Sequence, residues 1–288
     1  MQNERYVVGP ETMRMLELGH PWVIADRFTK RWPRGRAGEV ITLSDEKGKE
    51  LATALLDPGE RIVARVLGLG RVRFDQSWVR ERIERAAALR YDHADLDGTT
   101  AWRLVNGEGD GLPGLTVECY GEHLMIQLYT AAWGPHLPLV TSALQQVLSP
   151  TGIYEKFRPQ KTRELAAERQ DKKYSRLLAG EPAPGRVAVR ENGLEFLVTL
   201  EEELNTGLFL DQRVNRRDLM ARCRSKRSGN FSTSTSLTRP PPRKTRSVSY
   251  SSSRTSWPRR LQRPNSETGS PQIRAISRHC TCSHCARS

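Results

Sequence analysis

Acidic residues almost vanish from this sequence after residue 221. The 288-residue chain has 33 Asp and Glu residues, and of these Glu267 alone lies in the stretch 222–288, which holds 15 of the 46 Lys and Arg residues. The stretch 1–221 therefore carries a net charge of −1, and 222–288 carries +14. A strongly basic chain usually suggests a nucleic-acid partner. Here that inference is discounted, because the excess charge is confined to one end.

Cysteine and long apolar runs are also scarce. Cys119 is the one cysteine before residue 222, so no disulfide framework is implied there. No apolar run approaches the ~18–20 residues that cross a bilayer, and the N-terminus lacks the apolar core of a secretory signal. We therefore expect a cytoplasmic protein, and its length suggests two domains or three small ones.

The C-terminal stretch (222–288) lacks any sustained helix or strand period. It holds 23 Ser and Thr residues and too little apolar surface to offset chain entropy, so we expect a disordered basic tail. An abrupt change to Arg, Ser, Pro and Thr is typical of a GC-rich gene translated in the wrong frame. We hypothesise that the tail is a frameshift product; the alternative is a natural basic tail. The nucleotide sequence around codon 221 distinguishes them.

The N-terminal part (1–70) is predicted to be a small, mostly β unit. Its three β-rich runs, separated by turn residues, suggest a small barrel; the runs are 38–45, 50–57 and 61–68. Residues 11–20 predict one or two helical turns that end at Gly19, before Pro21.

The middle part (71–200) is predicted to be an α+β domain. Helices are expected at 77–90, with Ser77 as a candidate N-cap, and at 136–148. Strands are expected at 115–121, 123–130 and 151–157, and Asn192-Gly193 predicts a type I′ hairpin within 186–200. Residues 208–221 begin another helix. Cys119, within a predicted strand, is expected in the core.

The string RLVNGEGDGLPGL (103–115) predicts a sharply folded polar loop that leads into a strand. Its four glycines permit unusual backbone shapes, while Asn106, Glu108 and Asp110 supply oxygens. Such a loop suits calcium, but no acid closes it at the twelfth position, so the spacing misses the EF-hand pattern. A purely structural loop is the alternative.

Three strings, in order, resemble the large-subunit rRNA methyltransferase I family: GHPWV (19–23), the 103–115 loop and TGLFLDQRVNR (206–216). The resemblance covers roughly residues 5–220. It implies an N-terminal PUA-type RNA-binding barrel, a central domain, and a Rossmann-like domain that binds S-adenosylmethionine (SAM) and methylates C5 of a cytosine in 23S rRNA. Residues 201–221 would be the start of that last domain.

The resemblance makes the barrel an RNA-docking module, with His20 and Trp22 as candidate rRNA contacts. Arg61 and Arg65 share a strand face and would meet phosphates. Simpler interpretations are that His20 and Trp22 pack a turn, and that the arginines lie on a solvated edge strand.

The segment Asp211, Gln212 and Arg213 is the candidate cofactor-binding site, because in the resembled enzymes it lies beside the SAM pocket. An arginine there would pair with the cofactor's carboxylate or with RNA phosphate; an exposed amphipathic helix is the alternative. A SAM domain further needs a strand, a Gly-containing loop and an acid after a second strand. We find no such unit after residue 221, and therefore expect this polypeptide to bind SAM poorly and to turn over little.

The terminal string HCTCSHCARS has the soft-ligand character of a zinc site, but CxCxxC lacks a second ligand pair. The family's nucleophilic cysteine sits in a Ser-Cys-Ser string that Cys282-Ser283 resembles superficially. We assign no catalytic residue and no metal site. The rival interpretations are a non-catalytic RNA-binding protein that uses the barrel and the basic tail, and a metal-binding or scaffold protein that uses the terminal cluster.

Overall fold

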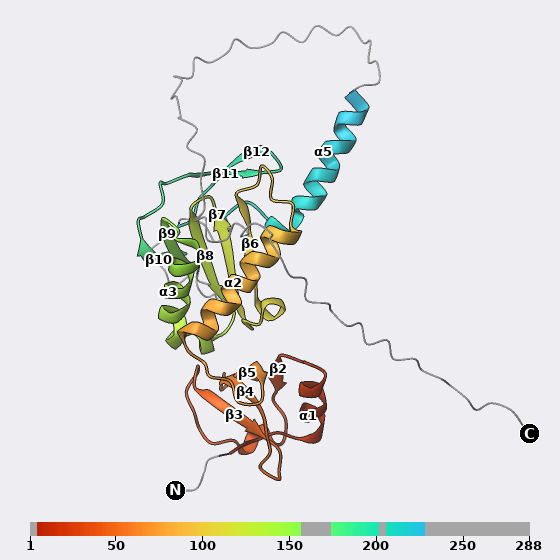
Figure 1. Cartoon of the computed structure of the whole chain (residues 1–288), viewed down its shortest axis with the longest axis vertical. Coiled ribbons are helices and arrows are strands. Elements are labelled where there is room, and N and C mark those ends of the chain that lie inside the picture. Colours follow the sequence, from red (N-terminus) through yellow and green to blue (C-terminus); the bar gives the residue numbers. More distant parts are fainter. Residues whose placement is uncertain (1–4, 157–173, 202–205, 228–288) are drawn as a thin grey trace, which may run out of the picture. The chain divides into compact units, whose positions relative to one another are not determined.

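The structure is a computed structural model that describes residues 5–156, 174–201 and 206–227, with side chains to residue 223 (Figure 1). All of these residues belong to one compact unit. Most of the expected tail and the terminal Cys and His residues lie outside the described residues. Within the described part, no helix is both long enough and apolar enough to cross a membrane.

The N-terminal part contains a five-stranded sheet in the order β1-β3-β4-β5-β2. Its strands are β1 (Tyr6–Val7), β2 (Trp22–Ile24), β3 (Val40–Ser44), β4 (Glu50–Leu56) and β5 (Ile62–Leu69). Only β1 and β3 run parallel among these pairs. The three predicted β-rich runs are thus confirmed as β3, β4 and β5. The edge-strand interpretation is wrong for Arg65, because β5 is hydrogen-bonded to β4 on one side and β2 on the other, whereas Arg61 precedes β5 and is solvent-exposed, as that interpretation expected.

Helix α1 (Pro10–Glu17) confirms the first predicted helix. Gly19, with φ of +81°, provides the left-handed residue that follows the helix end. Leu16 is the buried residue of α1, and it packs with Val8, Val23 and Leu43 in the core of the N-terminal sheet. A short helix with little apolar surface therefore depends on the sheet for its stability.

Helix α2 (Gln76–His93) links the N-terminal part to a second sheet. Its N-cap is Asp75, whose carboxylate accepts hydrogen bonds from the backbone N–H groups of Ser77 and Trp78. Ser77 is therefore not the cap: its hydroxyl instead donates to Asp75. A carboxylate suits this position because it also faces the positive end of the helix dipole.

The second sheet has the order β10-β9-β8-β7-β6. Its strands are β6 (Ala101–Asn106), β7 (Leu115–Tyr120), β8 (His123–Leu128), β9 (Gly152–Lys156) and β10 (Ser175–Gly180). Helix α3 (Leu137–Leu148) packs against α2, and both lie on one face of this sheet (Figure 1). Strands β6 and β10 were not expected from the sequence. Mixed strands and helices confirm the α+β class.

The opposite face of this sheet is partly covered by the hairpin of β11 (Val187–Glu191) and β12 (Leu194–Val198). Asn192 and Gly193 have φ of +52° and +79°, as the predicted type I′ turn requires. Helix α5 (Arg213–Arg227) follows a 3-10 turn, η4 (Leu210–Gln212). The helix thus continues past the boundary expected at residue 221, since residues 222–227 hold no Gly or Pro and are rich in Arg and Lys, which favour helix.

Candidate functional site

The register of the second sheet places polar side chains on its hairpin-facing side. Successive residues of a strand point to opposite faces. In β7, Leu115, Val117 and Cys119 therefore share one face, and Thr116, Glu118 and Tyr120 share the other. The pairing aligns the second set with polar residues of the neighbouring strands: Arg103 lies opposite Glu118, Gln127 opposite Thr116, and Lys156 opposite Gln127.

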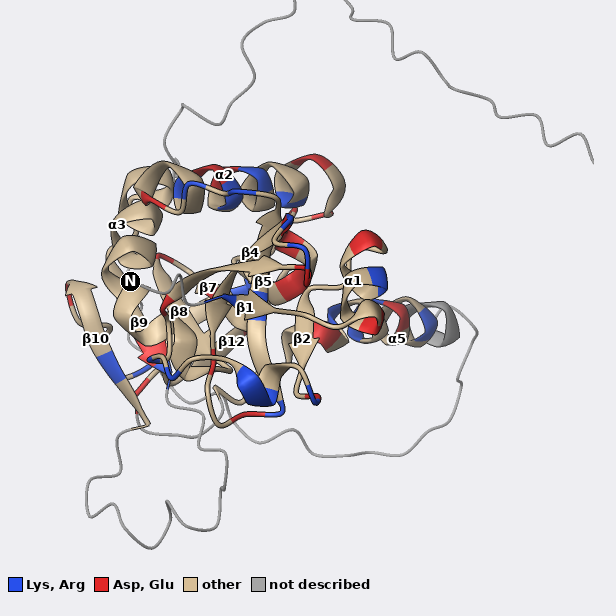
Figure 2. Ribbon diagram, turned by 90° about the horizontal axis from the view of Figure 1, so that it is seen from below, with Lys and Arg blue, Asp and Glu red and all other residues tan. Residues whose placement is uncertain are grey.

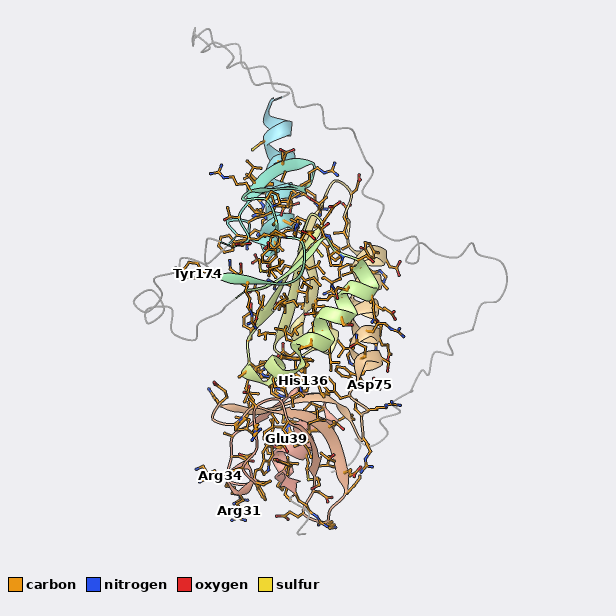
Figure 3. All side chains as sticks on the ribbon, turned by 90° about the vertical axis from the view of Figure 1, so that its left-hand side faces the viewer. Arg31, Arg34, Glu39, Asp75, His136 and Tyr174 are labelled. Atoms are coloured by element: carbon orange, nitrogen blue, oxygen red, sulfur yellow. The ribbon has the colours of Figure 1, made fainter. Side chains whose placement is uncertain are left out.

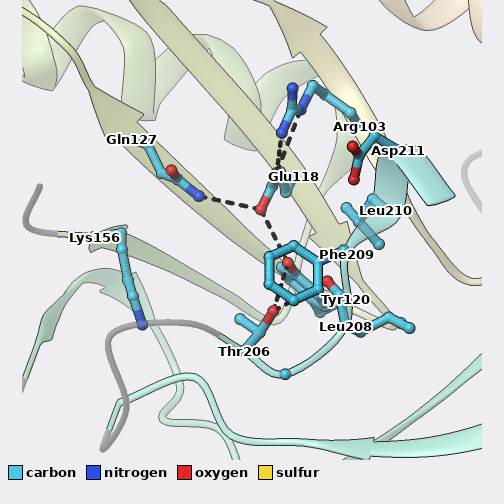
Figure 4. Close-up of a pocket in the computed structure, with 11 residues that line it drawn as sticks. Arg103, Glu118, Tyr120, Gln127, Lys156, Thr206, Leu208, Phe209, Leu210 and Asp211 are labelled. Atoms are coloured by element: carbon cyan, nitrogen blue, oxygen red, sulfur yellow. Dashed lines mark hydrogen bonds and ion pairs between the residues drawn. The ribbon is translucent and has the colours of Figure 1, made fainter.

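Only one end of this face is covered by apolar side chains. Tyr120, Met125 and Tyr154 pack against the β11–β12 hairpin and against Leu208, forming one hydrophobic cluster. Beyond that cluster the face carries Arg103, Glu118, Gln127 and Lys156, which border a cavity of about 70 Å³. The segment 206–211 forms its remaining wall, as Figure 4 shows.

Glu118 is the centre of a hydrogen-bond network on this face (Figure 4). Its Oε1 accepts from Arg103 Nη2 at 2.7 Å, and its Oε2 accepts from the Tyr120 hydroxyl at 2.9 Å and from Gln127 Nε2 at 3.1 Å. The Tyr120 hydroxyl also lies 3.0 Å from Thr206 Oγ1. The network thus ties the sheet to the segment that leads into α5.

The network fixes the charge states of its members. Burial alone would lower the pKa of Arg103, but its hydrogen bond to Glu118 and the carboxylate charge raise that pKa overall. Burial, reinforced by the charge of Glu118, raises the pKa of Tyr120. Tyr120 is therefore a neutral donor and Arg103 a permanent cation, and neither is suited to act as a general base near neutral pH.

The proposed cofactor residues do not all face this cavity. Asp211 lines it and is exposed. Gln212 Nε2 donates to Asp211 Oδ2 at 3.2 Å. Arg213 belongs to a different contact, since its Nη1 donates to the backbone oxygen of Asp95 at 2.7 Å. The structure thus brings Asp211 and Gln212 together and directs Arg213 toward the loop after α2.

Two further arginines, Arg216 and Arg217, hold α5 against neighbouring elements through ion pairs. Arg216 makes a bidentate pair with Glu191, at 2.6 and 2.7 Å, and Glu191 is only 1% exposed. Arg217 pairs with Asp95 at 3.2 Å, where both side chains are largely exposed. The alternative interpretation of this segment as an exposed amphipathic helix is therefore wrong for Arg216, whose partner lies on the β11–β12 hairpin.

Of the proposed RNA contacts His20, Trp22, Arg61 and Arg65, the fold places Trp22 next to both His20 and Arg65. The rings of His20 and Trp22 meet edge to face at 5.7 Å, and Trp22 Nε1 donates to Glu108 at 2.8 Å. Arg65 is buried, and pairs with Asp57 at 3.5 Å and with Glu108 at 3.7 Å. Arg61 is exposed and immediately precedes β5. Trp22 and Arg65 share one wall of a groove of about 510 Å³ whose other wall includes the 106–109 loop.

Both acids of the polar loop 103–115, Glu108 and Asp110, accept hydrogen bonds from other parts of the fold. The Asp110 carboxylate accepts two hydrogen bonds from the Arg90 guanidinium, at 2.6 and 2.7 Å, and a third from the backbone N–H of Asn106. Gly114 has φ of +80°, and a Cβ there would lie 3.2 Å from Arg65 Cζ. These contacts favour the structural interpretation of the loop over a calcium site. Among the described residues no group of three or more His, Cys, Asp or Glu side chains is placed to hold a metal.

Cys119 is fully buried in the sheet core, as expected, and burial raises the pKa of its thiol. A neutral, enclosed thiol is a poor nucleophile. Cys223 is exposed on α5. The described residues therefore hold no thiol arranged for covalent catalysis.

Sequence reasoning missed the Glu118 network. The signal was present in the alternation of β7, where Thr, Glu and Tyr interleave with Leu, Val and Cys. A strand that is apolar on one side and carries a carboxylate on the other indicates a polar site on that second face.

Comparisons with known proteins agree with this architecture. A model of the PUA-like domain matches residues 7–68. The chain is 32% identical over 217 residues to a ribosomal RNA large subunit methyltransferase I of Cronobacter sakazakii, covering 74% of this chain and 53% of the relative. It is 34% identical over 206 residues to a ribosomal RNA large subunit methyltransferase of Deinococcus radiodurans, covering 69% and 50%. The chain belongs to the large-subunit rRNA methyltransferase I family.

The chain is also similar in structure to solved methyltransferases. A candidate SAM-dependent methyltransferase from Streptococcus mutans matches with a TM-score of 0.64 and 26% identity, over 75% of this chain and 54% of that one. A second match of the same TM-score is described as a methyltransferase complexed with SAH. The chain thus spans about half the length of the family members it matches.

Proposed function

We propose that this chain derives from an enzyme that carries out SAM-dependent methylation of large-subunit rRNA in the cytoplasm, at C5 of a cytosine. The proposal is carried by two matches to relatives named for rRNA methylation, one of 217 residues at 32% identity and one of 206 residues at 34% identity. In this proposal the N-terminal part, with His20, Trp22, Arg61 and Arg65, helps to bind rRNA. Asp211, Gln212 and Arg213 would lie beside SAM.

We further propose that this polypeptide binds SAM poorly and has little turnover. The cavity beside Asp211, at about 70 Å³, is far smaller than the roughly 300–1,000 Å³ of typical ligand pockets. The cavity beside Asp211 is therefore too small for SAM, and the sequence after residue 227 has no strand and Gly-loop pattern to enlarge it. A frameshift near codon 221 would account for this pattern.

Isothermal titration of the full chain with SAM tests the second proposal. We expect no binding at micromolar SAM; micromolar binding would overturn it. Transfer of a labelled methyl group to 23S rRNA tests residual activity in the same preparation. Translation of the gene around codon 221 in all three frames tests the frameshift: an uninterrupted frame with no single-base discrepancy would refute it.

A non-catalytic RNA-binding protein is the second candidate function. The PUA-like model over residues 7–68 favours it, since that part has its own sheet and hydrophobic core. Tight binding of rRNA fragments, without SAM binding or methyl transfer, would support this alternative over the enzyme.

A further inference from the structure

The loop between β2 and β3 concentrates positive charge on the N-terminal part. Residues 27–36, RFTKRWPRGR, hold five basic side chains and no acid. All five are exposed; they are Arg27, Lys30, Arg31, Arg34 and Arg36. Figure 2 marks Lys and Arg positions in blue, and Figure 3 shows Arg31 and Arg34 with their side chains pointing away from the sheet. We call these five residues the loop patch.

The loop patch gathers several basic side chains that have no acidic partner among the described residues. Four exposed arginines in other parts of the described chain do pair with carboxylates: Arg71–Glu50, Arg73–Asp75, Arg80–Glu84 and Arg176–Glu155. Among the described residues no ion pair joins Lys30, Arg31, Arg34 or Arg36 to an acid. Glu39 lies close, but it accepts from the backbone N–H of Arg36. Arg27 lies over the Phe28 ring at 5.0 Å. Uncompensated cations gathered in one loop attract a polyanion.

The backbone of this loop is held in place by its own side chains. The Asp26 carboxylate accepts from the N–H groups of Phe28 and Thr29, at 2.9 and 2.8 Å, which begins the 3-10 turn η1 (Thr29–Arg31). Trp32 Nε1 donates to the Val7 oxygen at 2.7 Å. The ring of Trp32 also meets that of Tyr6 edge to face at 5.4 Å. The aromatic residues of the loop therefore serve as anchors.

An anchored loop presents its cations at lower entropic cost than a mobile one. Phe28 adds a further fixed point, because its ring packs so closely on Gly9 that a Cβ there would overlap it. Only the long side chains remain to be ordered when a ligand binds. Arg and Lys presented in this way recognise phosphate oxygens without reading bases.

We propose that the loop patch binds the phosphate backbone of the RNA substrate, independently of base sequence. The inference rests on the proposed rRNA function and assigns the phosphate contacts to residues other than those expected from the sequence. Arg65, one of the expected contacts, is buried and ion-paired, whereas Lys30, Arg31 and Arg34 are exposed and reach solvent.

The test compares two triple variants of the full chain that remove equal charge from the same part of the protein. The loop variant carries Lys30→Gln, Arg31→Gln and Arg34→Gln. The control carries Arg14→Gln, Lys47→Gln and Lys49→Gln, which are also exposed. Binding of a 23S rRNA hairpin fragment is measured across salt concentrations, and thermal melting checks the fold of each variant.

We expect the loop variant to lose affinity on the order of tenfold, and its slope of log K against log salt to fall by about 2, since each lost phosphate contact removes about 0.7–0.9. The control should keep the wild-type slope. Equal effects of both variants, or no effect of the loop variant, would overturn the inference while leaving RNA binding intact. Failure of the wild-type chain to bind the hairpin would overturn the rRNA function as well.

A second measurement avoids mutation altogether. Phenylglyoxal modification of wild-type arginines, read by peptide mass spectrometry, reports each position separately from the basic residues after 227. We expect RNA to slow modification of Arg31 and Arg34 but not of Arg85 and Arg190, which are exposed on α2 and β11. Unchanged rates at Arg31 and Arg34 in the bound state would contradict a loop contact.

Discussion

Glu118 shows how one buried carboxylate organises a sheet face. Its two oxygens accept from Arg103, Tyr120 and Gln127, so three donors on three strands depend on it. Glu118→Gln would leave Arg103 without its counter-charge and turn one acceptor atom into a donor. We expect a loss of about 2 kcal/mol in the free energy of unfolding, measured by urea denaturation at neutral pH.

The matched control is Glu84→Gln, which breaks an exposed pair with Arg80 on α2. Exposed pairs contribute little, so this variant should stay within about 0.5 kcal/mol of the wild type. Similar losses in both variants would show that the Glu118 network adds nothing beyond a surface ion pair.

His123 gives the second sheet a dependence on pH. Burial lowers the pKa of this imidazole, and the nearby Glu122 opposes that effect only in part. The folded state therefore binds a proton less readily than the unfolded chain. Stability should fall as pH drops below the ordinary histidine value of about 6.5, because the unfolded state then gains protons first.

His123→Phe should reduce that loss, because a phenyl ring binds no proton, and it can still pack near Tyr154, whose ring centre is 6.3 Å from the imidazole. The measurement is the change in melting temperature between about pH 7.5 and 5.5. His93→Gln is the control, since His93 is exposed at the end of α2. If both variants keep the wild-type pH dependence, other groups account for it.

At the scale of elements, the docking of α5 depends on its pairs with neighbouring elements. Arg216→Lys keeps the charge but loses the bidentate geometry with the buried Glu191. We expect amide protection in α5 to fall about tenfold, equivalent to roughly 1.4 kcal/mol. Arg217→Lys, whose pair with Asp95 is largely exposed, should change it little. Hydrogen exchange read by mass spectrometry distinguishes the two.

Most elements could be predicted because their signals are local. The Asn192-Gly193 turn, the amphipathic α3 and the β-rich runs of the N-terminal part each contain their own pattern. Strand β6 was missed because Arg103 breaks its apolar pattern and pairs with Glu118, which lies on the next strand of the chain. The N-cap of α2 was misassigned because Asp75 and Ser77 both have cap-forming side chains, and only geometry shows which one accepts from the backbone.

The candidate site was harder to predict, since its contacts join distant positions. Thr206 hydrogen-bonds to Tyr120, and Trp22 to Glu108, and in each pair the two residues are 86 positions apart in the sequence. Nothing local in the sequence separates an arginine that will be buried, such as Arg65, from exposed ones such as Arg31 and Arg34. The motif residues indicated the family, but the fold decides which of them are free to bind a ligand.

At the scale of the whole molecule, charge is divided unequally along the chain. The stretch 228–288 holds 11 Lys and Arg residues and one acid. Deletion should begin after Arg227 rather than at residue 222, because an earlier cut would remove the last turn and more of α5. We expect the shortened chain to bind RNA more weakly at low salt, with a smaller slope of log K against log salt, because fewer counterions are released.

Combining this deletion with the loop variant shows whether the two basic regions act independently. If each contacts its own phosphates, their effects on the slope should add, as expected for separate sites. The loop substitutions should then abolish most of the salt dependence that the deletion leaves. An unchanged slope after deletion would remove the basic residues beyond 227 from RNA binding. It would also leave the anchored loop of the N-terminal part as the principal source of electrostatic affinity.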